Sequence, residues 1–138
     1  MERLPLQFTS EDQVRLRALG IDVLYLFGSH AEGVATASSD VDVGVVAADA
    51  KGLSQGTNAL YLELYKLLSR YVPNSDRLDI VFLQRAPLEL RFDVVKHGIP
   101  IFSSSDDARL QFEERTTIAY CDFRPLLRQF DRAILEKP

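Results

Sequence analysis

Three short apolar runs divide the chain, and each has the length and composition of a buried β-strand. They occupy residues 22–27, 40–47 and 78–83 and read DVLYLF, DVDVGVVA and LDIVFL. β-Branched, leucine and aromatic side chains dominate these runs, which favours strands over helices at this length. A shorter apolar pair, Ile101–Phe102, predicts an additional edge strand.

Helices are predicted before, between and after the strands. The first begins at Thr9 or Ser10, where a capping side chain precedes two acids, and it ends at Gly20. Its apolar stripe is formed by Val14, Leu16 and Leu19.

The remaining helices follow from leucine spacing and from proline and glycine. Residues 58–71 carry leucines at helical spacing, at positions 60, 62, 64, 67 and 68. Pro87 begins a further helix, and residues 98–100 end it. Residues 106–136 are predicted to be mostly helical, with a break at Arg124–Pro125.

This order of elements predicts an α/β or α+β fold, in which a small mixed β-sheet is flanked by helices. The chain has 138 residues, which fits one domain spanning residues 1–138. Apolar residues make up 46% of it, enough for a core. Neither an internal repeat nor a linker interrupts the pattern.

Charge and cysteine content narrow the class of protein. The net charge is −4, so no global positive field is present to hold DNA or RNA. No apolar run approaches the about 20 residues that span a bilayer, and no signal pattern begins the chain. We therefore expect a cytoplasmic protein without a membrane segment. The single cysteine, Cys121, excludes an intramolecular disulfide and is predicted to lie in the core.

Acidic residues on two of the predicted strands are the strongest sign of chemistry. Asp40 and Asp42 are two positions apart, so both point to one face of their strand, and Asp79 enters the next strand. Adjacent strands would bring the three carboxylates together. Such a cluster is costly to desolvate unless a cation lies within it, and hard divalent cations prefer oxygen ligands. Two ions about 4 Å apart clamp the attacking and leaving oxygens of phosphoryl transfer.

The segment after the first strand suits a phosphate group. Gly28 allows close approach of the backbone, and Ser29 begins a short helical turn whose N–H groups and hydroxyl can donate hydrogen bonds. Ser38 and Ser39, just before Asp40, add two more hydroxyls. Taken alone, each of these features is more often a turn or a solvated strand end. Their combination on apolar strands favours a functional site, since buried charge there needs a partner.

Together these residues reproduce a known signature. Gly28-Ser29, ten intervening residues and then Asp40-Val41-Asp42 resemble the G-S-x10-D-x-D motif of the DNA polymerase β-like nucleotidyltransferase superfamily. The short chain resembles the minimal nucleotidyltransferase (MNT) family, the antitoxins of HEPN/MNT toxin–antitoxin modules. The resemblance extends over residues 24–130, including the segments APLELRFDVVKHGIPIF and RTTIAYCDFRPLLRQF.

The resemblance implies a polymerase β palm-like fold and a metal-dependent enzyme. By it, Asp40, Asp42 and Asp79 are the catalytic residues and the metal ligands, and Gly28, Ser29 and Ser39 contact the nucleotide. The implied cofactor is Mg²⁺, as two ions, with Mn²⁺ as the alternative. ATP is the implied substrate, and AMP is transferred to a tyrosine hydroxyl of a HEPN ribonuclease toxin, the implied partner.

One position departs from the family pattern. Glu32 stands in the segment GSHAEG where an arginine is usual, and an acid there would repel a triphosphate. His30 is expected to compensate in part, and Arg85, Arg91 and Lys96 are further basic candidates.

Two other functions remain open. The same chemistry could act on an RNA end or a small molecule, although the chain leaves no room for an acceptor-binding domain. Alternatively, the chain could be a non-catalytic module that occludes the toxin. Both a homo-oligomer and a hetero-oligomer are compatible with the sequence.

Overall fold

A computed structural model describes residues 7–36, 39–48, 58–72 and 77–135 of the chain. The described elements alternate between helices and strands, as the hydrophobic pattern predicts. In chain order they are α1 (Ser10–Ala18), β1 (Ile21–Phe27), α2 (Ser29–Glu32), β2 (Val41–Ala47), α4 (Asn58–Ser69), β3 (Leu78–Phe82), α5 (Leu88–His97), β4 (Ile99–Ser103) and α6 (Asp106–Leu135).

The four strands form one mixed sheet in the order β3-β2-β1-β4. β1 pairs antiparallel with β2 and with β4, whereas β2 pairs parallel with β3. The parallel pair needs a crossover, which contains α4. The predicted fold class, a small mixed sheet flanked by helices, is confirmed.

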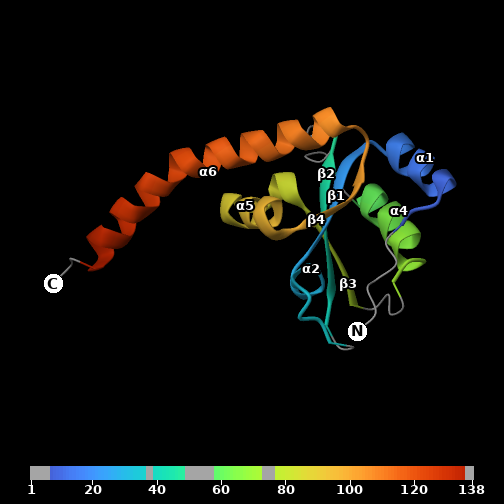
Figure 1. Ribbon diagram of the computed structural model, residues 1–138, viewed down its shortest axis with the longest axis horizontal. Coiled ribbons are helices and arrows are strands. Elements are labelled where there is room, and N and C mark those ends of the chain that lie inside the picture. Colours follow the sequence, from blue (N-terminus) through green and yellow to red (C-terminus); the bar gives the residue numbers. More distant parts are fainter. Residues whose placement is uncertain (1–6, 37–38, 49–57, 73–76, 136–138) are drawn as a thin grey trace.

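Helices cover both faces of the sheet, with α1 and α4 on one side and α5 and α6 on the other (Figure 1). Alternate residues of β1 serve the two sides: Leu24 and Leu26 pack toward α1 and α4, whereas Val23 and Tyr25 pack toward α5. The central strands are therefore apolar on both faces, which explains why their sequences read as nearly continuous apolar runs.

The predicted apolar stripes of two helices are partly wrong. In α1, Leu16 is fully buried as predicted, but Val14 is 65% exposed. The second buried residue of this helix is Asp12. In α4, Leu64 is fully buried but Leu62 is 57% exposed. The predicted start and stop of α1 are confirmed: the Thr9 side chain accepts a hydrogen bond from the Asp12 N–H, and Gly20 has a positive φ of 77°.

The predicted edge strand is longer than the pair Ile101–Phe102. β4 begins at Ile99 directly after α5 and includes Pro100. Proline is compatible with an edge strand, where one side of the backbone has no partner strand. Gly98 ends α5 as predicted, and its N–H donates to the Val94 carbonyl at 2.7 Å.

The predicted break at Arg124–Pro125 is wrong, because α6 is one 30-residue helix with Pro125 inside it. The proline removes one backbone donor, but this part of α6 is exposed, so water can hydrate the carbonyl left without a partner. Cys121 is exposed rather than buried, and so are Phe123 and Phe130. The prediction that Cys121 lies in the core is wrong, because no other described element packs on this part of the helix (Figure 1).

No helix among the described residues is long and apolar enough to cross a membrane.

Candidate active site

The parallel pairing of β2 and β3 places two of the predicted aspartates side by side. Asp42 is the second residue of β2 and Asp79 the second residue of β3, and they are direct partners in the strand register. In β2, Val41, Val43 and Val45 pack toward α1 and α4, as do Leu78 and Ile80 in β3. Strand alternation therefore directs Asp42 and Asp79 to the opposite face of the sheet.

Asp40 completes the acidic group. It lies one residue before β2 and is exposed, as is Asp79, whereas Asp42 is half-buried. Burial raises the pKa of Asp42 above its ordinary value, and the negative charges of Asp79 and Asp40 raise it further. The three acids thus interact electrostatically, as expected for carboxylates that converge at one end of the sheet.

Gly28 lies against this acidic group for a steric reason. It follows β1, whose last residue, Phe27, is the register partner of Asp42. Gly28 has a φ of 75°, and a β-carbon built on it would approach the Asp42 carboxylate, 3.3 Å from its Cγ and nearer still to Oδ2. Only glycine permits both the backbone conformation and the contact.

Ser29 and Ser39 lie on the two segments that flank Gly28 and Asp40. Ser29 begins α2, a single helical turn that is capped by Gly33. The backbone N–H groups in the first turn of a helix have no acceptor within the helix, and the N–H of Ser29 is one of these groups. The Ser39 hydroxyl accepts a hydrogen bond from the Thr36 N–H at 2.8 Å, which uses it in a local turn. Ser38 lies outside the described residues.

The sequence did not decide the role of His30, which lies near the acids in the structure. Its charge lowers the pKa of Asp42, in opposition to burial and the two neighbouring acids. The Nε2 atom of His30 is buried and makes no hydrogen bond to the described residues. Glu32, at the other end of the same turn, is exposed. The only signal for His30 in the sequence is its position directly after Ser29.

The structure excludes Arg91 as a residue that reaches this site. Together with Asp22 and Ala48 it lines a cavity of about 410 Å³. Asp22 begins β1 and Ala48 follows β2, so this cavity lies at the opposite end of the two strands from Gly28 and Asp42.

The carboxylates of Asp40, Asp42 and Asp79 are suitable ligands for a hard divalent cation, but they do not by themselves form a complete coordination shell. Among the described residues, no group of three or more acidic, histidine or cysteine side chains is gathered closely enough to hold an ion by itself. Mg²⁺ is usually bound through one or two carboxylates together with substrate phosphates, rather than by protein alone. A cation would offset the burial of Asp42 and the repulsion from Asp79 and Asp40, which together raise the pKa of Asp42.

The small mixed sheet flanked by helices matches a polymerase β-like nucleotidyltransferase fold. The chain belongs to the polymerase β nucleotidyltransferase family, because the model of the family described as "Polymerase beta, Nucleotidyltransferase" matches residues 15–107. The match contains Gly28, Asp42 and Asp79. No curated protein matches the chain in sequence.

Solved structures of toxin–antitoxin complexes share the fold along nearly the whole chain. A chain from a toxin–antitoxin structure with AMP-PNP is 25% identical, with a TM-score of 0.67, and the match covers 92% of this chain and 99% of that one. A chain from a complex of an MNT antitoxin with the tri-AMPylated Shewanella oneidensis HEPN toxin is 24% identical, with a TM-score of 0.59, covering 91% and 97%. A third, from an MntA toxin–antitoxin complex in which two aspartates two positions apart are changed to glutamate, is 21% identical, with a TM-score of 0.69, covering 93% and 99%.

Proposed function

We propose that this protein is an antitoxin that transfers AMP from ATP to a tyrosine hydroxyl of a HEPN toxin, in a reaction that depends on Mg²⁺. The observation that carries the proposal is the register pairing of Asp42 with Asp79, next to Asp40 and Gly28. Family membership supports nucleotidyl transfer in general. The similar toxin–antitoxin structures, one with AMP-PNP and one with an AMPylated HEPN toxin, support the nucleotide and the acceptor.

The three aspartates and the turn at Gly28 and Ser29 have separate roles in this proposal. Asp40 and Asp42 would hold the metal ions, and Asp79 would be the third ligand. Bound Mg²⁺ supplies positive charge that neutralises the triphosphate and the charge developing in the transition state. Gly28 would let the backbone approach the phosphates, and the Ser29 N–H and hydroxyl would donate to them.

The bond changes balance without any further reactant. The tyrosine oxygen attacks the α-phosphorus of ATP and forms a new phosphorus–oxygen bond, while the bond from the α-phosphorus to the bridging oxygen of the β-phosphate breaks. Pyrophosphate leaves, and Asp79 accepts the hydroxyl proton. Asp79 suits this role because it is exposed beside Asp42, where an incoming hydroxyl has access.

Labelled transfer tests the proposal. We expect the protein, Mg²⁺ and ATP labelled on the α-phosphate to label a HEPN-family protein in a lysate from the same source. Asp79→Asn should lower this transfer by orders of magnitude with the fold retained, since it removes a ligand and the base. Asp93→Asn is the matched control: Asp93 is an exposed aspartate on α5, and this variant should transfer normally.

Two results would count against the proposal. Normal transfer by Asp79→Asn would refute the site assignment. Absence of any labelled HEPN protein with the wild-type chain would refute the acceptor, and the same reaction run with RNA and with small-molecule acceptors would then identify the alternative. If the wild-type chain blocks the toxin without labelling it, the protein is a non-catalytic binding module.

A further inference from the structure

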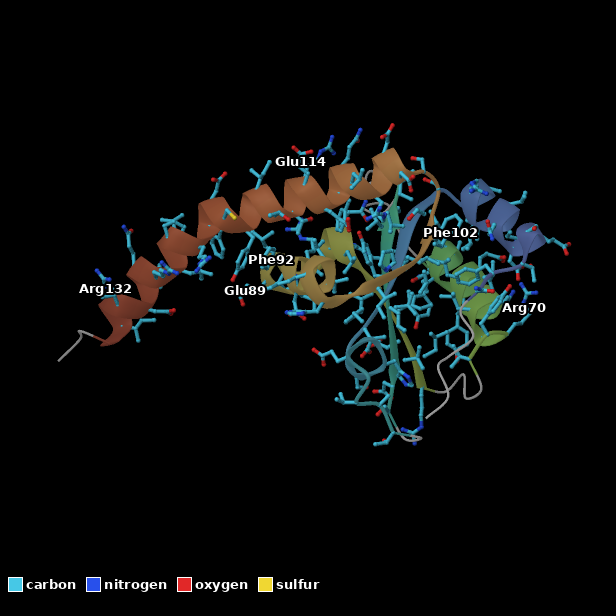
Figure 2. All side chains as sticks on the ribbon, in the orientation of Figure 1. Arg70, Glu89, Phe92, Phe102, Glu114 and Arg132 are labelled. Carbon is cyan, nitrogen blue, oxygen red and sulfur yellow. The ribbon has the colours of Figure 1, made fainter. Side chains whose placement is uncertain are left out.

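The long helix α6 has two halves in different surroundings. The first half packs on the domain: Tyr120 stacks on Phe92 of α5 with ring centroids 3.9 Å apart, and Glu113 accepts a hydrogen bond from the Tyr25 hydroxyl at 3.1 Å. The second half of α6 projects past α5, and no other described element lies beside it (Figure 1). Figure 2 shows Phe92 beneath the first half and Arg132 at the far end of the projection.

The packing face of α6 continues along the projection. Thr116 is buried against the domain, and Phe123 and Phe130 follow it at intervals of seven residues, which keeps them on the same face. Leu126 and Ile134 extend this face. We call Phe123, Leu126, Phe130 and Ile134 the α6 stripe; their exposed fractions are 37, 59, 71 and 62%.

The α6 stripe has the pattern of a helix that docks into a partner. Its members are spaced by three and four residues, as are the anchors of an amphipathic helix that lies in an apolar groove. Leu126, Phe130 and Ile134, with Gln129 and Ala133, also line a shallow hollow of about 280 Å³ that could receive an apolar side chain. Contiguous exposed apolar surface of this kind marks interaction sites.

Charge indicates the chemistry of the partner. The projecting segment, residues 121–135, carries Arg124, Arg128 and Arg132 against two acids, Asp122 and Asp131, so it is positive on balance. None of these arginines forms an ion pair with a described residue. A second copy of the chain would bring equally positive charge to the same seam, which disfavours self-association, whereas an acidic rim on the partner would favour binding.

We infer that the projecting half of α6 is the docking helix by which this protein binds its toxin, through an apolar groove with an acidic rim. The inference rests on the proposed function, which makes a HEPN protein the acceptor. It assigns recognition to a surface distinct from the aspartates. The alignment with the toxin–antitoxin structure that contains AMP-PNP covers 92% of this chain, so it includes most of the 30-residue α6.

A binding measurement with two full-length variants tests the inference. We expect Phe130→Ser to weaken binding of a HEPN-family protein from the same source by more than about tenfold, because an exposed aromatic anchor would be lost. Phe130 is 71% exposed and packs on no other element in the described part of the chain, so thermal stability should not change, and neither should Mg²⁺-dependent ATP binding. Cys121→Ser, also exposed on α6, is the matched control and should bind the toxin normally.

The outcomes separate this inference from the proposed function. Equal binding by wild type and Phe130→Ser, with normal AMP transfer by both, would overturn the docking surface and leave the proposed function intact. No binding and no transfer by the wild-type chain would overturn both. If light scattering finds a wild-type dimer that Phe130→Ser converts to a monomer, a second copy covers the α6 stripe and the inference is wrong.

Discussion

Asp12 shows how a single buried carboxylate connects two helices. It lies in the first turn of α1, with a side chain only 8% exposed, and it accepts hydrogen bonds from the Tyr71 hydroxyl and, at 2.7 Å, from Arg70 at the end of α4. Figure 2 shows Arg70 at this end of the molecule. The Tyr71 hydrogen bond, and then Arg70, hold the pKa of Asp12 below its ordinary value despite burial, which acts in the opposite direction.

Replacement of Asp12 should therefore have a pH-dependent effect on stability. Because the folded-state pKa lies below the unfolded value, the stabilisation is present above the unfolded pKa and is lost as pH falls through the folded pKa. We expect Asp12→Asn to lower the free energy of unfolding by about 1 kcal/mol at pH 7, since Arg70 is exposed and screened. Urea unfolding at pH 7 and pH 3 measures this, and a difference that does not shrink in acid would contradict it.

Gly28 offers a test of the site at one atom. Gly28→Ala should destabilise the fold by about 1 kcal/mol because φ is positive, and should also displace the Asp42 carboxylate. Gly20→Ala is the control: its φ is 77°, but no atom lies within 4 Å of a β-carbon there. Gly28→Ala should lose more stability in thermal unfolding than Gly20→Ala, because its β-carbon also meets Asp42, and only Gly28→Ala should lose Mg²⁺-dependent ATP binding in calorimetry. Intact binding by Gly28→Ala would remove this turn from the site.

At the scale of elements, α4 illustrates which leucines support the sheet. Leu64, Leu67 and Leu68 pack against β2 and β3 in the larger core, whereas Leu62 points to solvent. Helical spacing alone marks all of them as apolar, but only one face of a helix can contact a sheet.

Leu64→Ala should therefore cost far more stability than Leu62→Ala. The first leaves a cavity in a fully buried position and should lower the free energy of unfolding by about 2–5 kcal/mol. The second changes an exposed side chain and should change it by less than about 0.5 kcal/mol. Chemical denaturation of the two variants, which remove the same atoms from one helix, makes the comparison. Similar losses would show that Leu62 is covered in solution.

At the scale of the whole molecule, the repulsion among the acids at one end of the sheet destabilises the folded state, and a bound cation would reduce that repulsion. The chain carries a net charge of −4, and the pKa of Asp42 is raised by burial, Asp79 and Asp40. A cation bound with a triphosphate would stabilise the folded state, because the unfolded chain does not bring these acids together.

Ligand-induced stabilisation should follow from this. We expect Mg²⁺ with an ATP analogue that has a methylene bridge between the α- and β-phosphates to raise the melting temperature of the wild-type protein. At about one hundred times the Kd the gain would be about 2.7 kcal/mol. Asp42→Asn should show little shift, as should the wild-type protein with the nucleotide and EDTA. A full shift in EDTA would mean that the nucleotide binds without metal.

The sequence by itself determined the local features of this protein. Apolar runs and capping residues located the helices and strands to within a few residues, since these depend on neighbours in the chain. The segment from Gly28-Ser29 to Asp40 and Asp42 resembles a nucleotidyltransferase signature, and it can be recognised in the sequence because it spans only one short stretch of chain, from the α2 turn to the start of β2. The two-residue spacing of Asp40 and Asp42 predicted that both point to one face of the strand.

Only the tertiary structure decided what lies beside what. The parallel register that pairs Asp79 with Asp42, and the contact of Gly28 with Asp42, depend on strand order, which a hydrophobic pattern does not encode. Burial is likewise a property of the packed molecule. Val14, Leu62, Cys121 and Phe130 read as core residues by composition or spacing, yet each lies on a helix face that no other described element covers.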